Sequence, residues 1–300
     1  MRSYACLTGT PWNHLTFHQR LTFAKEASLG TDGYIYRGLQ AKPLTIRGLD
    51  FSDPTSFVEG LLENYTAPQE VRAIIDINAS FKGISNLRVA QEIARYIDRN
   101  QTKLSAPPKV IKYLLFFNEK NELSALRLQS QMENQRPIVI GSSDPKHIQQ
   151  CLGCDPSERF TFYDQAHTVG TDVLQAPASK AVVLIDPKET HLNAFYQGIM
   201  RMRRLLEGNQ SIDIVVPKES QQLSVGRLIE MMAQQEQEQL QKDNFTAAQL
   251  KMANLLRNDV LKRLLNIQGE DSVLKKQAFL QSMRGYFVEK QQQTLFQQYG

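Results

Sequence analysis

Apolar residues gather in short, β-branched runs between about residues 70 and 217, and a polar turn follows each run. The six runs are VRAIIDI (71–77), VIKYLLFF (110–117), RPIVIG (136–141), RFTFYD (159–164), KAVVLID (180–186) and SIDIVVP (211–217). Runs that are this short and almost continuously apolar are typical of strands covered on both faces. They predict the strands of a mostly parallel sheet.

Two of the segments between these runs have the period of an amphipathic helix. In residues 86–100 the apolar positions from Leu87 to Ile97 fall on one face. Residues 189–208 carry a second apolar stripe, and Gly208 suits the end of that helix. Strands that alternate with helices predict an α/β protein with a mostly parallel sheet in three layers.

The composition changes after Pro217, the last proline of the chain. Residues 218–300 are rich in Gln, Leu, Lys, Glu and Met, which predicts long helices with a break near NIQGED (266–271). The stretch AQQEQEQLQKDN (233–244) is polar nearly all round, which indicates a solvated helix or a linker between helices. A partner-binding coiled coil is the alternative, although the apolar heptads are irregular.

The first 70 residues mix turn signals with short β-prone runs. We therefore expect three segments. Residues 1–70 form the end of a preceding lobe or an irregular N-terminal segment, residues 71–217 form the α/β lobe, and residues 218–300 form a helical extension.

Composition narrows the class of protein only a little. The chain has 300 residues, 41% of them hydrophobic and 22% charged, with a formal net charge of +4. This charge permits contact with nucleic acid without arguing for it. The three cysteines Cys6, Cys151 and Cys154 favour a reducing, cytoplasmic setting without a disulfide framework. No apolar run is long enough to predict a membrane span or a secretory signal, while a C-terminal export signal remains open.

One candidate site lies just after the strand predicted at 159–164. Ligands of an open α/β sheet bind where the carboxyl ends of parallel strands meet. Gly170, Thr171 and Asp172 follow this strand and offer close backbone approach, a hydroxyl and a carboxylate. An ordinary polar turn would have the same composition.

A second candidate group lies on the helix predicted at 189–208. Gln197, Arg201 and Arg204 are spaced by four and three residues, so we expect them to share a helix face. Arginine is suited to phosphate recognition because its guanidinium is planar and always charged. The alternative is a basic helix end that the helix dipole favours.

Two further patterns can be interpreted either as functional motifs or as ordinary turns and loops. TGTP (8–11) contains Thr8 and Thr10 and is equally consistent with a turn at its proline. The DQAH box (164–167) suggests an ATPase motif, but it lies about 150 residues after TGTP. In a helicase the order is reversed, and the DEAH box precedes the motif that corresponds to TGTP. We expect Asp164 and His167 to shape the loop that presents residues 170–172.

In chain order, TGTP, GTD (170–172) and Q-x-x-x-R-x-x-R (197–204) resemble motifs III, V and VI of superfamily 2 helicase-like ATPases. Longer blocks, AIIDINASFKGISNLRVAQEI (73–93), YDQAHTVGTDVLQAP (163–177) and RMRRLLEGNQSIDIVVP (201–217), resemble a helicase-like domain-of-unknown-function family of very large proteins. Members of that family are often labelled ubiquitinyl hydrolases. The resemblance covers roughly residues 1–217 and implies the second RecA-like lobe of a helicase-type ATPase.

The sequence departs from the family pattern at two places. It contains no Gly-Lys-Ser or Gly-Lys-Thr, so the phosphate cradle and its lysine are missing. Gln165 stands where the family usually has Glu, and an amide cannot act as a carboxylate base. The resemblance therefore implies a lobe that is inactive alone and that binds ATP and Mg²⁺ only together with a partner lobe.

The resemblance also implies roles for individual residues. Arg201 and Arg204 would be arginine fingers, Gly170, Thr171, Asp172 and Gln197 would contact or sense the nucleotide, and no metal would be bound by the lobe itself. The expected partner is a missing N-terminal ATPase lobe or a larger parent protein.

Two other functions remain open at this point. The lobe is a non-catalytic scaffold whose helical tail binds a protein partner, or the chain is a cysteine-dependent ubiquitin hydrolase. The second alternative depends on CLGC (151–154), where Cys151 or Cys154 would pair with His167. The same spacing also suits a zinc site, a redox pair or inert loop thiols.

Overall fold

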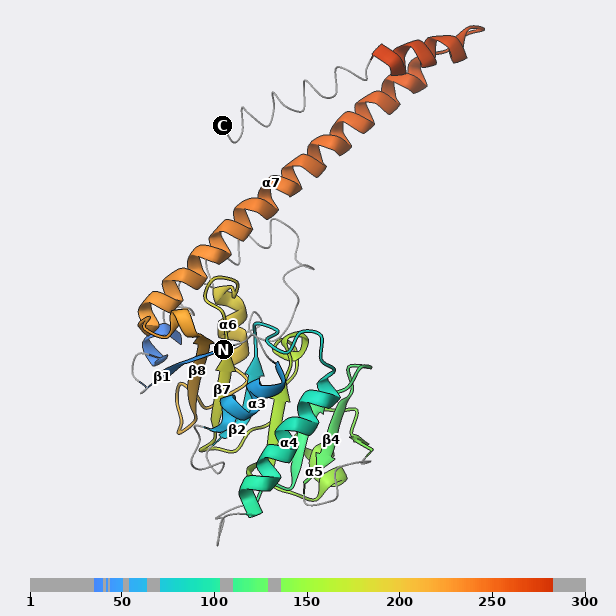
Figure 1. Ribbon diagram of the computed structural model, residues 1–300. Helices are drawn as coiled ribbons and strands as arrows, with labels where there is room; N and C mark the ends of the chain where they lie inside the picture. Colours follow the sequence, from blue (N-terminus) through green and yellow to red (C-terminus); the bar gives the residue numbers. More distant parts are fainter. Residues whose placement is uncertain are drawn as a thin grey trace. The chain divides into compact units, whose positions relative to one another are not determined.

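A computed structural model of the chain describes residues 35–39, 42, 44–50, 54–63, 71–102, 110–128 and 136–282 (Figure 1). The chain divides into two compact units, Met1–Gln235 and Glu236–Gly300. Within the described residues, the first unit is built around one sheet with the strand order β1-β8-β7-β2-β6-β3-β4-β5.

The sheet is mostly parallel, as the sequence predicts. Its strands are β1 (Thr45–Leu49), β2 (Val71–Asp76), β3 (Tyr113–Phe117), β4 (Leu123–Arg127), β5 (Ile138–Val139), β6 (Arg159–Tyr163), β7 (Lys180–Leu184) and β8 (Ser211–Pro217). The neighbours from β1 to β3 in the sheet order pair in parallel, and β4 is antiparallel to both β3 and β5. Strands β1 and β4 are additions to the six predicted runs.

Helices cover both faces of this sheet, which confirms the predicted α/β class. One apolar cluster joins the sheet to α3 (Pro54–Glu63) and α4 (Asn86–Thr102). The other joins it to α5 (Pro145–Leu152), α6 (Leu192–Ile199) and the first turns of α7 (Val225–Asn266). Alternation along β2 separates the two clusters, because Ile74 packs in the first and Ile75 in the second.

Helix α6 is shorter than the predicted helix at 189–208. It ends at Ile199, and turns follow as far as Gly208. The amides of Arg201 and Met202 bond to carbonyls three residues back, at Gly198 and Ile199, both at 3.0 Å. This tighter winding replaces the α-helical bonds. Of the three residues expected to share a face of this helix, only Gln197 lies within α6, and Arg201 and Arg204 lie in the turns that follow.

The predicted helical extension is confirmed by α7, which begins in the first unit and continues into the second. Residues 233–244 are helical and mostly exposed, as their polar composition predicts. The predicted break near 266–271 is also confirmed, since α7 ends at Asn266, Gly269 has a φ of 109°, and helical residues resume at 272.

Candidate functional site at the carboxyl edge of the sheet

Three neighbouring parallel strands, β2, β6 and β3, end beside one another at the carboxyl edge of the sheet. Asp76 is the last residue of β2, Phe117 ends β3, and Asp164 directly follows β6. In parallel sheets this edge is where ligands bind. The carboxyl-edge site, as we call it, consists of Asp76, Phe117, Asp164, His167, Thr171, Asp172, Arg201 and Arg203.

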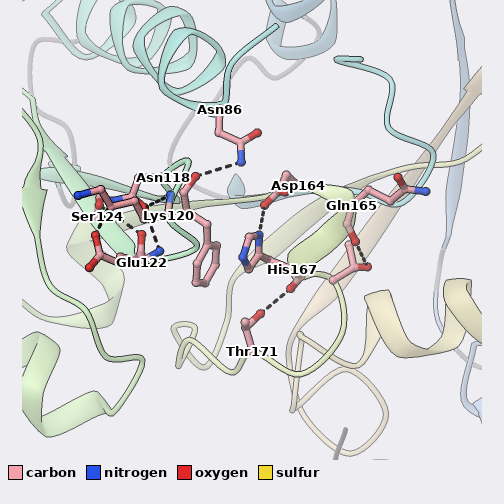
Figure 2. A network of polar contacts seen from close by, with 11 residues as sticks. Asn86, Asn118, Lys120, Glu122, Ser124, Asp164, Gln165, His167 and Thr171 are labelled. Carbon is pink, nitrogen blue, oxygen red and sulfur yellow. Dashed lines mark hydrogen bonds and ion pairs between the residues drawn. The ribbon is translucent and has the colours of Figure 1, made fainter. Parts of the chain in front are cut away.

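Asp164 and His167 form a close side-chain contact at the end of β6. The Asp164 Oδ1 lies 2.6 Å from the His167 Nδ1, across the short 3₁₀ turn Gln165–His167 (Figure 2). The imidazole stacks on the ring of Phe117, with centroids 4.1 Å apart and planes 5° apart. When Nδ1–H donates to the carboxylate, Nε2 of the neutral ring is left as an acceptor.

Hydrogen bonds on two sides hold the backbone that carries the Phe117 ring. The Asn86 side chain, at the start of α4, donates to the Phe117 carbonyl at 3.0 Å (Figure 2). The next residue, Asn118, accepts the amides of Lys120 and Glu122 with its Oδ1, both at 2.9 Å. These bonds close the turn between β3 and β4, so the hairpin fixes the surface against which His167 stacks.

The loop after His167 is fixed by its own hydroxyls. Thr168 Oγ1 donates to the Gln165 carbonyl at 2.8 Å, and Thr171 Oγ1 donates to the His167 carbonyl at 2.5 Å. Gly170 has a φ of 80°, in the left-handed region that favours glycine. The predicted Gly-Thr-Asp element is thus an ordered turn that folds back on the Asp164–His167 pair.

Tyr163, the last residue of β6, secures the far side of this loop from within the core. Its hydroxyl donates to the Val173 carbonyl at 3.1 Å and accepts from the Gln175 side chain at 3.2 Å. Burial raises the pKa of Tyr163 to about 12, so the phenol stays protonated and keeps donating at neutral pH.

Arg201 binds the loop from the opposite side. It is 4% exposed, and its Nη1 donates to the Thr171 carbonyl, while its Nε donates to the Gln197 carbonyl at 3.3 Å. Burial, and then the neighbouring Arg203, lower the pKa of Arg201. The turn after α6 therefore connects directly to Thr171.

The two arginines that follow are more accessible. Arg203 forms an ion pair with Asp172, with Nη2 and Nε at 2.8 and 3.0 Å from Oδ2. Arg204 is exposed, and its guanidinium has no hydrogen-bond or ion-pair partner among the described residues. Its backbone amide donates to the Gln210 side chain at 2.7 Å, which fixes the chain at this point.

Asp76 is a member of the site that the sequence reasoning missed. It is 2% exposed, and its two carboxylate oxygens accept the amides of Ser80 and Phe81 at 2.9 and 3.3 Å. Burial raises the pKa of Asp76 to about 6, although these two hydrogen bonds lower it, and the charge of nearby Asp164 raises it further. The sequence feature that could have identified Asp76 is its position at the end of a predicted strand, which matches the position of Asp164 directly after β6.

The two described cysteines do not form a nucleophile–base pair with His167. Cys151 is exposed and lies 3.7 Å from the Nε2 of His147, but this nitrogen is also 3.0 Å from the Ile140 carbonyl. A carbonyl only accepts, so Nε2 carries the hydrogen and is not free to take a thiol proton. Cys154 is buried, and Arg159 donates to its sulfur at 3.4 Å.

The described part of the chain contains no group of three or more His, Cys, Asp or Glu side chains that could hold a metal ion. None of its helices is both long and apolar enough to cross a membrane.

Most predicted site residues come together at the carboxyl edge. Asp164, His167, Gly170 and Thr171 share the loop after β6, and Arg201 joins this loop to Gln197. Asp172 also belongs to this loop and pairs with Arg203, and Arg204 is the next residue in the chain after Arg203. Thr8, Thr10 and Cys6 lie outside the described residues. The chain matches no protein-family model, no curated protein and no solved structure.

Proposed function

We propose that this chain acts as the second lobe of a helicase-like ATPase and completes a nucleotide site with a separate P-loop lobe. The observation that carries the proposal is the contact between Arg201 and the Thr171 carbonyl. It connects an arginine-rich turn with the loop at the carboxyl edge, where an open α/β sheet binds ligands. Such a connection lets a change at the nucleotide reach the rest of the lobe.

The contacts divide the two predicted fingers into different roles. Arg201 is buried and engaged by two carbonyls, so it positions the loop that carries Thr171. Arg204 is exposed and its guanidinium is free among the described residues, so it is the arginine available to a phosphate. A guanidinium placed there stabilises the charge that develops on a transferring γ-phosphoryl group.

The remaining parts of the reaction belong to the partner lobe. Because the chain lacks a Gly-Lys-Ser/Thr loop, it is expected to bind ATP only when another lobe cradles the phosphates. Mg²⁺ would neutralise phosphate charge in the joined site, and no described residue here is assigned to it. A reducing, cytoplasmic setting belongs to the same proposal.

The test joins the full chain to a separate P-loop lobe and measures ATP hydrolysis and nucleotide binding separately. Arg204→Ala is expected to lower kcat by about 10³-fold while nucleotide affinity changes little. Arg227→Ala is the matched control, because Arg227 is an exposed arginine that pairs with Glu230 at 3.0 Å on α7. Unchanged hydrolysis in Arg204→Ala would refute the finger role.

A further inference from the structure

The second compact unit exposes a group of large apolar side chains. Those that are exposed in its described part are Leu240, Phe245, Leu250, Leu255, Leu261, Leu265, Val273, Leu274 and Leu280. By contrast, the first unit exposes only a few isolated side chains of this kind among its described residues. Contiguous apolar patches on a protein surface mark contact sites more often than scattered ones do.

Three of these leucines form one line along α7, which we call the outer stripe: Leu250, Leu261 and Leu265. Eleven residues are about three helical turns and four are about one turn, so these positions lie above one another. Their exposed fractions are 63%, 49% and 74%. On another side of the same helix, Val260 is 8% exposed. Helix α7 therefore has one sheltered side and, on another side, a line of three exposed leucines that no described residue covers.

Basic residues border the outer stripe. Lys251 and Lys262 each follow a stripe leucine by one position, and Arg257 lies one turn before Leu261. None of these three cations is paired with a carboxylate in the part of the chain that the structure describes.

Between Leu250 and Leu265 the helix carries a single acidic residue, and it lies away from the stripe. Asp259 precedes Leu261 by two positions, which places it about 200° round the helix. It is also paired with Arg263 at 3.1 Å. The accessible charge beside the leucines is therefore positive.

Exposed leucines with basic residues beside them favour one kind of binding partner for the outer stripe over the others. A second copy of the chain in a coiled coil would need apolar residues between Leu250 and Leu261, where Asn254, Arg257 and Asn258 stand instead. A nucleic acid would use the cations but leave the leucines in water. A bilayer surface with anionic headgroups uses both, because leucines enter the acyl boundary while lysine and arginine reach the headgroups.

We propose that the outer stripe of α7, with Lys251, Arg257 and Lys262 beside it, docks the protein on a membrane surface that contains anionic lipids. The helix lies along the surface and does not cross it, in keeping with the lack of a spanning helix among the described residues. The inference stands independently of the ATPase proposal, since it uses the second unit alone.

The experiment sediments the full chain with vesicles of phosphatidylcholine alone or mixed with phosphatidylserine. Binding is expected to the mixed vesicles and to weaken at high salt. The double variant Leu261→Gln/Leu265→Gln and the double variant Lys251→Gln/Lys262→Gln should each lose more than about tenfold in affinity. Leu174→Gln is the matched control, because Leu174 is 47% exposed but lies in the first unit.

Circular dichroism of each variant shows whether its helix content is kept. If the leucine double variant loses helix content, Leu250→Gln takes its place. Equal binding of the leucine variants and the unchanged protein would overturn the proposal. The proposal would also be overturned if the protein did not bind mixed vesicles but bound heparin, and if the leucine variants bound heparin equally well. That result would identify a polyanion site. Concentration-dependent dimerisation abolished by the leucine changes, without vesicle binding, would identify a second copy as the occupant and overturn it as well.

Discussion

Asp76 is the residue whose environment gives the clearest pH dependence. Its folded pKa of about 6 exceeds its ordinary value of 3.8, so the folded state holds a proton that the unfolded state releases between these pH values. The free energy of unfolding should therefore fall as pH rises from 4 to 6, by on the order of 2–3 kcal/mol from this group. Urea denaturation across this range, compared between the unchanged protein and Asp76→Asn, measures the contribution. Identical pH slopes in the two proteins would exclude it.

Arg201 and Arg203 contact the same loop but differ in burial, and this difference predicts different energetic effects. Arg201→Met removes a buried guanidinium and leaves the half-buried Thr171 carbonyl without its donor, which should cost about 2–4 kcal/mol of stability. Arg203→Met removes an ion pair whose side chains are 36% and 51% exposed, so it should cost less than about 1 kcal/mol. Denaturant midpoints of the two variants test this order, and a larger cost for Arg203→Met would contradict it.

For single residues, the sequence indicated which of them lie close together but not which are buried or what they contact. The spacing of Asp164, His167 and residues 170–172 placed them on one loop, and the structure brings them together. It could not show that Arg201 is buried, because that depends on the turn after α6 rather than on local spacing. Asp76 was missed because an acidic residue at a strand end has no local signature of burial.

The loop at 164–175 is the element whose order depends most on one core side chain. Tyr163→Phe removes the hydroxyl that bonds to the Val173 carbonyl and to Gln175, which should cost about 1–2 kcal/mol. Amide hydrogen exchange should become faster in this loop and stay unchanged in α4. Tyr113→Phe is the control, because the Tyr113 hydroxyl has no partner among the described residues. Equal exchange in both variants would show that the tyrosine does not hold the loop.

Strands and helices were predictable where local pattern and tertiary packing agree. Five of the six apolar runs became β2, β3, β6, β7 and β8, because both faces of each are covered. Strand β4 was missed because Ser124 and the residues around it do not form an apolar run, although Asn118 closes a turn just before it. The predicted helix at 189–208 extends past the end of α6 at Ile199, because the following turn is held by contacts far apart in the sequence, such as the bond from Arg201 to the Thr171 carbonyl.

The two compact units make separate predictions for the whole molecule. The apolar clusters on both faces of the sheet contain no described residue beyond Met232. A chain that ends at Gln235 should therefore keep the thermal unfolding midpoint of the first unit within a few degrees, followed by near-ultraviolet circular dichroism. A drop of more than about 8 °C, equivalent to more than about 2 kcal/mol for a domain of this size, would show that residues beyond 235 stabilise the sheet.

The central claim is that the carboxyl-edge site works as half of a nucleotide site, with Arg204, the residue that follows Arg203 of the site, as the arginine available to a phosphate. The most direct measurement is steady-state ATP hydrolysis by the full chain alone, by the P-loop lobe alone and by both joined. The account predicts turnover only in the joined protein, and its loss by about 10³-fold in Arg204→Ala with Arg227→Ala unaffected. Hydrolysis that needs no contribution from this chain, or that is indifferent to Arg204, would contradict it.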